Sequence, residues 1–165
     1  MNKNIPDIYN FLQEIAWHFG NHGFEGECCE DLSLVEFMAL KAAYENNNFS
    51  IQEIGGAINF TKSGATRIID RLENKGYVKR ERSLIDGRVC CVPVTDKGTQ
   101  FISKIIKKDT NYVEELLQDL EPQVVDNIKT ALEILVKSLP RQGPIMSEDV
   151  MTRKGCSSEH IDEHN

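Results

Sequence analysis

The sequence predicts a mostly α-helical fold with a small two-stranded β wing, namely a winged helix-turn-helix with long helices at its N- and C-terminal ends. Three observations predict this class. Apolar residues recur at helical spacing in five segments, and a capping box marks one more helix. Two consecutive short helices are joined by a tight turn, and the second has a polar and basic outer face. Two strand-like segments separated by a turn follow them, before the last two helices.

The first helix is predicted from an apolar stripe that runs from Ile5 to Phe19, with Pro6 in the first turn. Ser33 followed by Glu36 forms a capping box that opens a second helix, which extends to about residue 45. Ser50 and Glu53 repeat the same signal at the start of a short third helix.

The fourth helix is the candidate recognition helix. Thr61 caps it and Gly76 ends it. Its inward positions are predicted to be Ala65, Ile68, Ile69 and Leu72. Its outward positions are predicted to be Lys62, Ser63, Thr66, Arg67, Asp70 and Arg71.

The wing is predicted from "YVKRERS" and "RVCCVPV", with the turn "LIDG" between them. Thr95 then caps a fifth helix, and Pro122 opens the sixth. We therefore expect four regions: residues 1–30, a dimerisation helix with a cysteine-containing loop; 31–98, the winged helix-turn-helix; 99–139, C-terminal dimerisation helices; and 140–165, a disordered tail.

Length and composition exclude several classes. The 165 residues suit one domain or one domain with a tail. No run of 18 apolar residues indicates a membrane span, and the N-terminus has no signal-peptide pattern, so we expect a cytoplasmic protein without membrane partners. In that compartment the five cysteines are expected to be thiols or ligands rather than disulfides.

Charge is distributed unevenly along the chain. The formal net charge is −7, but residues 61–91 hold eight Lys or Arg against four Asp or Glu. A basic region in an acidic protein is consistent with one face that binds a polyanion. A solvated surface of mixed charge is the alternative.

The stretch "DGRVCCVPVTDKG" resembles the wing signature of the MarR family of transcription regulators. Residues Asp86, Arg88, Val92, Thr95 and Gly98 match that signature in register, and Val94 replaces its usual leucine. The preceding "TRIIDRLENKGYVKRERS" also resembles the recognition helix and first wing strand of the family. The resemblance covers about residues 5–139.

The resemblance implies roles for individual residues. It implies that Arg88 enters a DNA minor groove, where an arginine suits the negative potential, and Asp86 is expected to brace the turn. The alternative is that Arg88 only pairs with Asp86. Major-groove contacts are implied for Lys62, Ser63, Thr66, Arg67 and Arg71, against the alternative of a solvated helix face.

The cysteines raise a separate hypothesis. Strand alternation predicts that Cys90 faces the core and Cys91 the opposite face. Adjacent thiols in a loop can bind a soft ion, which gives the candidate ligands Cys28, Cys29 and Cys156, with His18 and His22 as weaker ones. The alternative is that these residues share no ligand, since no metal-binding spacing of the CxxC type is present.

The preferred interpretation is a homodimeric regulator that binds double-stranded operator DNA, acts as a repressor and is released by an effector. No cofactor is required; the effector is a soft metal, a trivalent metalloid or a small aromatic molecule. The sequence has no nucleophile–base constellation and no phosphate loop, so an enzyme is not expected. The alternative is a winged-helix module that binds protein and not DNA, which the overall acidity favours slightly.

Overall fold

The structure is a computed structural model and describes residues 4–20, 31–46 and 49–140. Within these ranges the predicted class is confirmed. The elements are α1 (Ile5–Gly20), α2 (Leu34–Glu45), α3 (Ile51–Ala57), α4 (Lys62–Asn74), β1 (Glu81–Arg82), β2 (Cys90–Cys91), α5 (Asp96–Leu117) and α6 (Pro122–Ser138). The predicted tail, except for residue 140, lies outside the described residues.

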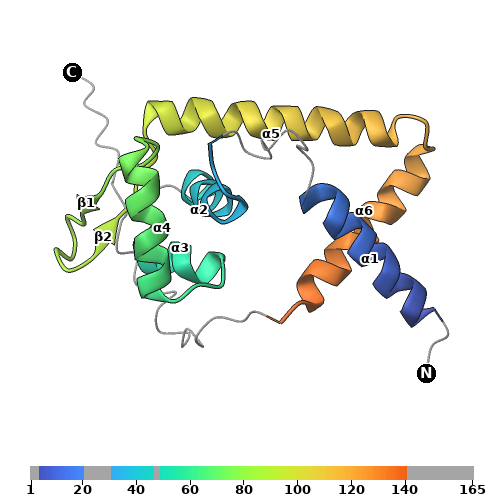
Figure 1. The fold of residues 1–165 in the computed structure, drawn as a ribbon, viewed down its shortest axis with the longest axis horizontal. Coiled ribbons are helices and arrows are strands. Elements are labelled where there is room, and N and C mark those ends of the chain that lie inside the picture. Colours follow the sequence, from blue (N-terminus) through green and yellow to red (C-terminus); the bar gives the residue numbers. More distant parts are fainter. Residues whose placement is uncertain (1–3, 21–30, 47–48, 141–165) are drawn as a thin grey trace, which may run out of the picture.

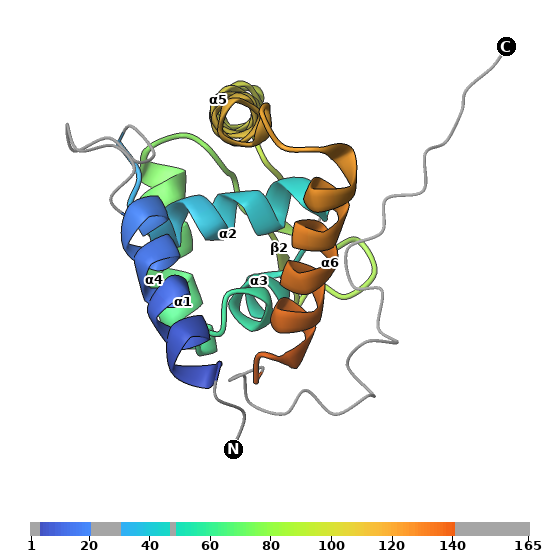
Figure 2. The same ribbon diagram turned by 90° about the vertical axis from the view of Figure 1, so that its right-hand side faces the viewer.

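Helix α5 runs along one side of the molecule and connects its two ends (Figure 1). Helices α2, α3 and α4 and the wing gather at one end, whereas α1 and α6 lie at the other. In the perpendicular view α1 and α6 stand on either side of the molecule, with α5 seen end-on above them (Figure 2). Over the described ranges, no helix combines the length and apolarity needed to cross a membrane.

The hydrophobic core lies within the winged end. Its fully buried side chains come from α2, α3, α4, the wing segment and the first half of α5, and the largest are Leu40, Ile54, Ile69, Leu72, Val78, Val92 and Ile102. All four positions predicted to face inward on α4 are buried. The apolar spacing of that helix therefore predicted its packing correctly.

Both predicted capping boxes are present. The Ser33 hydroxyl accepts from the Glu36 backbone N–H at 3.3 Å, and the Glu36 carboxylate accepts from the Ser33 N–H at 2.9 Å. Ser50 and Glu53 form the same reciprocal pair at the start of α3. These bonds satisfy backbone donors that a helix start leaves free, which is why both helices begin where the sequence predicts.

The turn between α3 and α4 brings the two helices close together. Asn59 in this turn has φ of 58°, a left-handed conformation that asparagine tolerates better than most residues. A Cβ at Gly55 would lie 3.0 Å from the Ala65 Cβ and 3.1 Å from the Phe60 carbonyl oxygen. The absence of a side chain at Gly55 therefore allows the helix-turn-helix to close.

The wing strands are shorter than predicted. Strands β1 and β2 pair antiparallel, with Arg82 opposite Cys90, and a single further bridge joins Val78 to Val94. On its other side β2 bridges to Ser50, just before α3. The wing is thus fixed to the helix-turn-helix by backbone contacts as well as by side chains.

The prediction that Cys90 faces the core is confirmed, because its side chain packs against the core cluster. Cys91 is 5 % exposed and the neighbouring Val92 is fully buried, whereas Cys90 is a free, half-buried thiol. Cys91 is not part of that cluster, yet it is buried as well, so both faces of the strand are covered at this point. Cys91 is also disulfide-bonded, so the expectation that every cysteine is a thiol or a ligand does not hold for it.

A junction between the wing and α5 explains two residues of the wing signature. The Thr95 hydroxyl caps α5 by accepting from the Gly98 N–H at 3.0 Å, and it donates to the Gly76 carbonyl at 2.7 Å. A Cβ at Gly98 would lie only 2.1 Å from the Tyr77 carbonyl oxygen. Thr95 and Gly98 therefore allow the start of α5 to pack directly on the chain that leaves α4.

We expect Gly98→Ala to destabilise the protein by about 2–4 kcal/mol, since the new methyl group would overlap a backbone oxygen and force the junction apart. The measurement is the free energy of unfolding from urea denaturation. The matched control is Gly87→Ala, because a Cβ at Gly87 meets nothing within 4 Å. Equal stability of the two variants would contradict the prediction.

Candidate nucleic-acid interface

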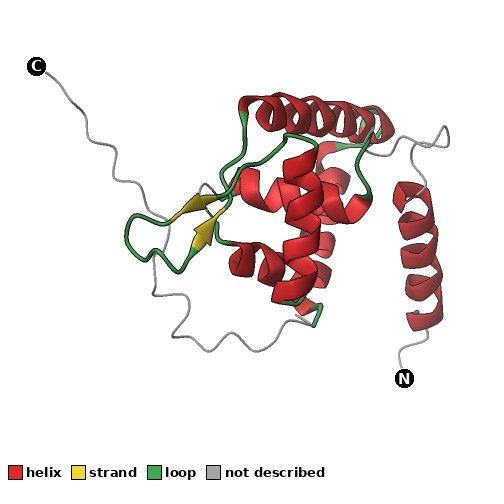
Figure 3. Cartoon of the chain, turned by 60° about the vertical axis from the view of Figure 1, so that its left-hand side comes forward, coloured by secondary structure: helices red, strands yellow, loops and turns green. Residues whose placement is uncertain are grey.

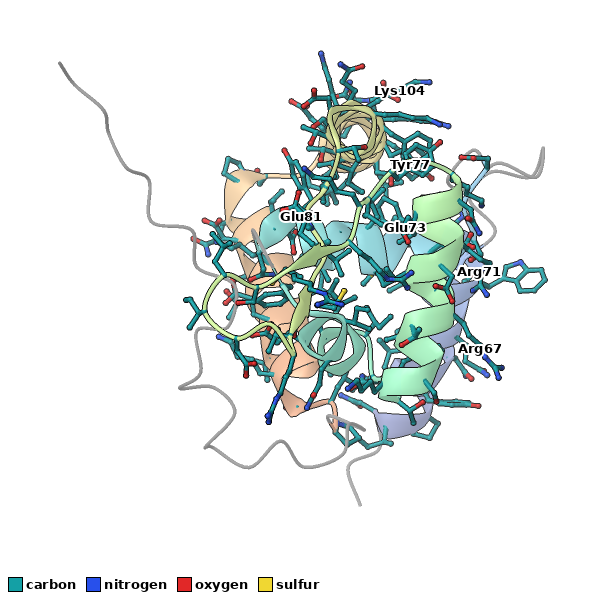
Figure 4. The ribbon with its side chains drawn as sticks, turned by 90° about the vertical axis from the view of Figure 1, so that its left-hand side faces the viewer. Arg67, Arg71, Glu73, Tyr77, Glu81 and Lys104 are labelled. Atoms are coloured by element: carbon teal, nitrogen blue, oxygen red, sulfur yellow. The ribbon has the colours of Figure 1, made fainter. Side chains whose placement is uncertain are left out.

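Helix α4 and the wing lie on the same side of the molecule (Figure 4). The wing projects beyond the body of the helices, and α1 lies far from it (Figure 3). The face formed by the outer side of α4 and the wing, residues 61–91, is the basic region of the chain, and we call it the basic face. The residues predicted to contact DNA all belong to α4 and the wing, which lie on this side of the molecule.

The amino end of α4 is open to solvent. Lys62 and Ser63 are exposed, and the Thr61 hydroxyl accepts from the Gly64 N–H at 3.2 Å. Thr66 is half-buried and its hydroxyl donates to the Lys62 carbonyl at 2.8 Å, so only its acceptor capacity remains available. A helix start with accessible N–H groups and a lysine is suited to a phosphate.

The two arginines of α4 differ in their surroundings. Arg67 is exposed and projects from the outer side of the helix, and its side chain pairs with no residue in the part of the chain that the structure describes (Figure 4). Arg71 lies one turn later, and its Nε donates to the Glu36 carboxylate at 2.6 Å. Arg67 is thus available for a ligand, whereas Arg71 is held by α2.

Glu36 is a buried carboxylate that links α2 to the carboxyl end of α4. It is 4 % exposed and accepts from the Ser33 backbone, from Arg71 and from Lys75, whose Nζ lies 3.2 Å away. Burial alone would raise the pKa of Glu36, but these hydrogen bonds and the charge of Lys75 outweigh it and lower the pKa from 4.5 to about 2. The carboxylate therefore stays ionised and fixes the end of the recognition helix.

Arg80 connects α4 to the wing, and the sequence analysis did not identify it. Its guanidinium donates to Asp70 at 2.6 Å and to Glu73 at 2.8 Å, while its backbone N–H donates to Glu73 at 3.1 Å. Burial alone would lower the pKa of Arg80, but the hydrogen bond to Asp70 and the two carboxylate charges raise it overall. We call this contact the Arg80 clamp. Its sequence signal was the charged run of residues 79–82, Lys-Arg-Glu-Arg, at the start of the wing.

The wing turn is built by short polar contacts. The Ser83 hydroxyl accepts from the N–H groups of Ile85 and Asp86, at 3.2 and 3.3 Å. The Asp86 carboxylate accepts from the Arg88 backbone N–H at 3.0 Å. Asp86 thus contacts the wing turn through the backbone of Arg88. The Arg88 side chain is exposed and forms no ion pair with any described residue, so the alternative of an Arg88–Asp86 salt bridge is not observed.

The wing also carries a shallow hollow, and most of the charged residues that line it are positive. Three arginines line it, Arg80, Arg82 and Arg88, together with one acidic residue, Glu81. Arg80 is already neutralised by the carboxylates of α4, but Arg82 and Arg88 are exposed. The wing therefore offers two accessible positive charges beside the recognition helix.

The candidate metal ligands are not brought together within the described residues. Cys28, Cys29, Cys156 and His22 lie outside them. His18 is on α1, where its Nε2 lies 2.5 Å from the Tyr112 hydroxyl and its ring stacks on the Tyr112 ring. In residues 4–20, 31–46 and 49–140, no group of three or more potential ligands is close enough to hold a metal. A soft-metal site at these residues stays a prediction.

Comparison with known families and proteins identifies relatives of the chain. The family model described as the MarR family matches residues 32–90. The transcriptional repressor MprA of Escherichia coli K12 is 30 % identical over 105 residues, which are 62 % of this chain and 60 % of MprA. The HTH-type transcriptional regulator BilQ of Clostridioides difficile CD3 is 35 % identical over 102 residues, 54 % of this chain and 67 % of BilQ. The match to MprA thus spans less than two thirds of that protein.

Solved structures share the fold over a longer stretch. A MarR family protein from Bacillus stearothermophilus superposes with a TM-score of 0.72 at 22 % identity, over 83 % of this chain and 96 % of that one. FabT of Streptococcus pneumoniae, solved in complex with DNA, superposes with a TM-score of 0.67 at 18 % identity, over 80 % of this chain and 92 % of FabT. The matches confirm the predicted family, and the relatives named here are transcriptional regulators rather than enzymes.

We expect the Glu36 contacts to make stability depend on pH. The folded pKa is about 2 and lies below the ordinary value of 4.5, so the stabilisation is complete above pH 4.5 and is lost as pH falls toward 2. Glu36→Gln should therefore lower the free energy of unfolding by about 2–3 kcal/mol at pH 7, and by much less near pH 2. Urea denaturation at several pH values measures this.

The matched control for this prediction is Glu45→Gln, on the same helix. Glu45 is exposed and pairs only with Lys41, at 3.7 Å, among the ion pairs of the described residues. Its substitution should change stability little at any pH. A Glu36→Gln variant with the same stability loss at pH 2 as at pH 7 would show that the loss does not come from the ionised carboxylate.

Proposed function

The chain belongs to the MarR family, and on this premise we propose that it is a dimeric, sequence-specific DNA-binding transcriptional regulator. The observation that carries the proposal is the basic face, where Arg67 on α4 and Arg88 on the wing are exposed and unpaired within the described residues. The chain as a whole has a net charge of −7. A cationic face on an acidic protein attracts a polyanion to one side and orients it.

The proposed DNA contacts are of three kinds: to phosphates, to bases in the major groove and to the minor groove. Lys62 and Ser63 at the amino end of α4 are suited to backbone phosphates. Arg67 and the acceptor oxygen of Thr66 are placed one turn later, where a helix in the major groove meets base edges. Arg88 is suited to the minor groove. Arg71 is better explained as a brace of α4, because Glu36 already binds its guanidinium.

The dimer is inferred from apolar helices that the described part of the chain does not cover. Helix α6 has no buried residue, and Leu132, Leu135 and Leu139 are 45 %, 38 % and 65 % exposed. On α1, Phe11 and Ile15 are 62 % and 46 % exposed. Patches of this kind are typical of protein interfaces. A second copy would bury both stripes and present two recognition helices to successive major grooves.

We further propose that the protein represses transcription and that an effector releases it from DNA. MprA is named a transcriptional repressor, which supports the same role here. An effector that changes the spacing of the two recognition helices would weaken DNA binding. A soft metal or metalloid at the cysteines, or a small aromatic molecule, remains the proposed effector class. A cytoplasmic location follows from the proposed role.

We expect Arg88→Ala and Arg67→Ala to weaken duplex DNA binding by about 1–3 kcal/mol each, without unfolding the protein, because both side chains are exposed. Arg67→Ala should relax the preference between DNA sequences. Fluorescence anisotropy with genomic fragments and random duplexes, at several salt concentrations, measures both effects. The control is Lys137→Ala on α6, whose side chain is 78 % exposed, far from the basic face.

A wild-type protein that shows no salt-dependent affinity for any duplex would contradict the proposed function and favour the protein-binding module. An equal loss on specific and random DNA for Arg67→Ala would remove that residue from base recognition. Each outcome is read at a salt concentration where the wild type binds measurably.

We expect the protein to sediment as a dimer at micromolar concentration, and Leu132→Lys to shift it toward monomer because a charge would enter the buried stripe. Analytical ultracentrifugation measures the distribution. Asn127→Lys is the matched control, since it adds the same charge to a polar, exposed position of α6. A wild type that is monomeric throughout would reject the dimer.

A further inference from the structure

The tip of the wing displays two large apolar side chains. Leu84 is 96 % exposed, the highest value for any large hydrophobic among the described residues, and the adjacent Ile85 is 64 % exposed. Polar and small residues are the usual choice at a hairpin turn. Neither side chain packs on the core, so the fold does not explain them.

The tip is held in shape rather than loosely placed. Ser83 is 7 % exposed, its N–H donates to the Val89 carbonyl at 3.0 Å, and its hydroxyl accepts from the two following N–H groups. The Val89 N–H in turn donates to the Asp86 carbonyl at 2.8 Å. These bonds fix the backbone on both sides of Leu84 and Ile85. The apolar pair is therefore presented outward by a closed turn.

The surroundings of the pair indicate what it contacts. Arg82 on β1 and Arg88 just before β2 flank the tip, and both are exposed. The apolar stripes of α1 and α6 lie at the other end of the molecule, so the tip is not part of the surface assigned to the dimer (Figure 1). An apolar tip between two cations is complementary to a ligand surface that has negative charge at its edges and apolar groups between them. The minor groove of DNA has this composition, with phosphates at its edges and deoxyribose along its sides.

We propose that Leu84, with Ile85 beside it, packs against the deoxyribose walls of the minor groove next to Arg88. The inference rests on the proposed DNA binding and adds a contact of a different kind. Arg88 contributes an attraction that salt weakens, whereas the apolar pair contributes one that depends on the shape of the groove and not on ionic strength. Apolar side chains are used in this way by proteins that enter the minor groove.

The test compares salt dependences. The double variant Leu84→Ala, Ile85→Ala should bind a duplex about tenfold more weakly than wild type at every salt concentration, with an unchanged slope of log affinity against log salt. Arg88→Ala should lower that slope by about one. The matched control is Leu84→Met, which keeps the apolar bulk and should bind within about twofold of wild type. Urea denaturation of each variant should match wild type, because both side chains are exposed.

A second duplex locates the contact. Inosine in place of guanosine removes an amino group from the minor groove and leaves the major-groove pattern of the base pair intact. Wild type should bind this duplex more tightly, and the double variant should lose part of that gain. An equal gain in both proteins, or a changed salt slope in the double variant, would overturn the proposal.

The two proposals fail in different ways. If wild type binds no duplex, the proposed function fails and the wing contact fails with it. If wild type and Arg88→Ala behave as expected but the double variant binds like wild type, only the apolar contact is overturned.

Discussion

The Arg80 clamp is the interaction on which the basic face depends. A recognition helix and a wing can act on one ligand only if the angle between them is fixed, and β1 and β2 are too short to fix it alone. The guanidinium of Arg80 spans Asp70 and Glu73 on α4, and its own backbone starts the wing. Planar, multidentate binding of two carboxylates suits this task better than a single ammonium would.

The Arg80 clamp also reduces the negative charge on the basic face. Asp70 and Glu73 would repel a polyanion from the outer side of α4, but both pair with Arg80, whose positive charge offsets one of their two negative charges. Glu36 is removed from the surface by burial and is matched by Arg71 and Lys75. Acidic groups near α4 are thus paired with cations that serve the fold, while Lys62, Arg67 and Arg88 are exposed. Net charge along the sequence understates this separation, because it counts paired and accessible groups alike.

Local signals predicted the elements well and the long-range contacts poorly. Ser33, Ser50, Thr61 and Thr95 marked helix starts correctly, because a cap acts within three residues of its own position. Glu36 and Arg71 are 35 residues apart, and no local pattern joins them. Cys91 likewise bridges to Ser50, a residue far from it in the sequence. Four of the six positions predicted to face outward on α4 are exposed, and Thr66 and Asp70 are half-buried. The helical spacing could not show which of the two arginines a distant carboxylate would bind.

The exposure of α1 has a consequence for folding cooperativity. A helix of 16 residues is marginal in water on its own backbone hydrogen bonds, and α1 contributes no residue to the hydrophobic core. Near its carboxyl end, the rings of His18 and Phe19 contact Tyr112 on α5. Helix formation in α1 and burial of its apolar stripe are therefore expected to be one coupled event. Amide hydrogen exchange in α1 would then report how much of the chain is assembled, whereas exchange in α4 would report the stability of the core.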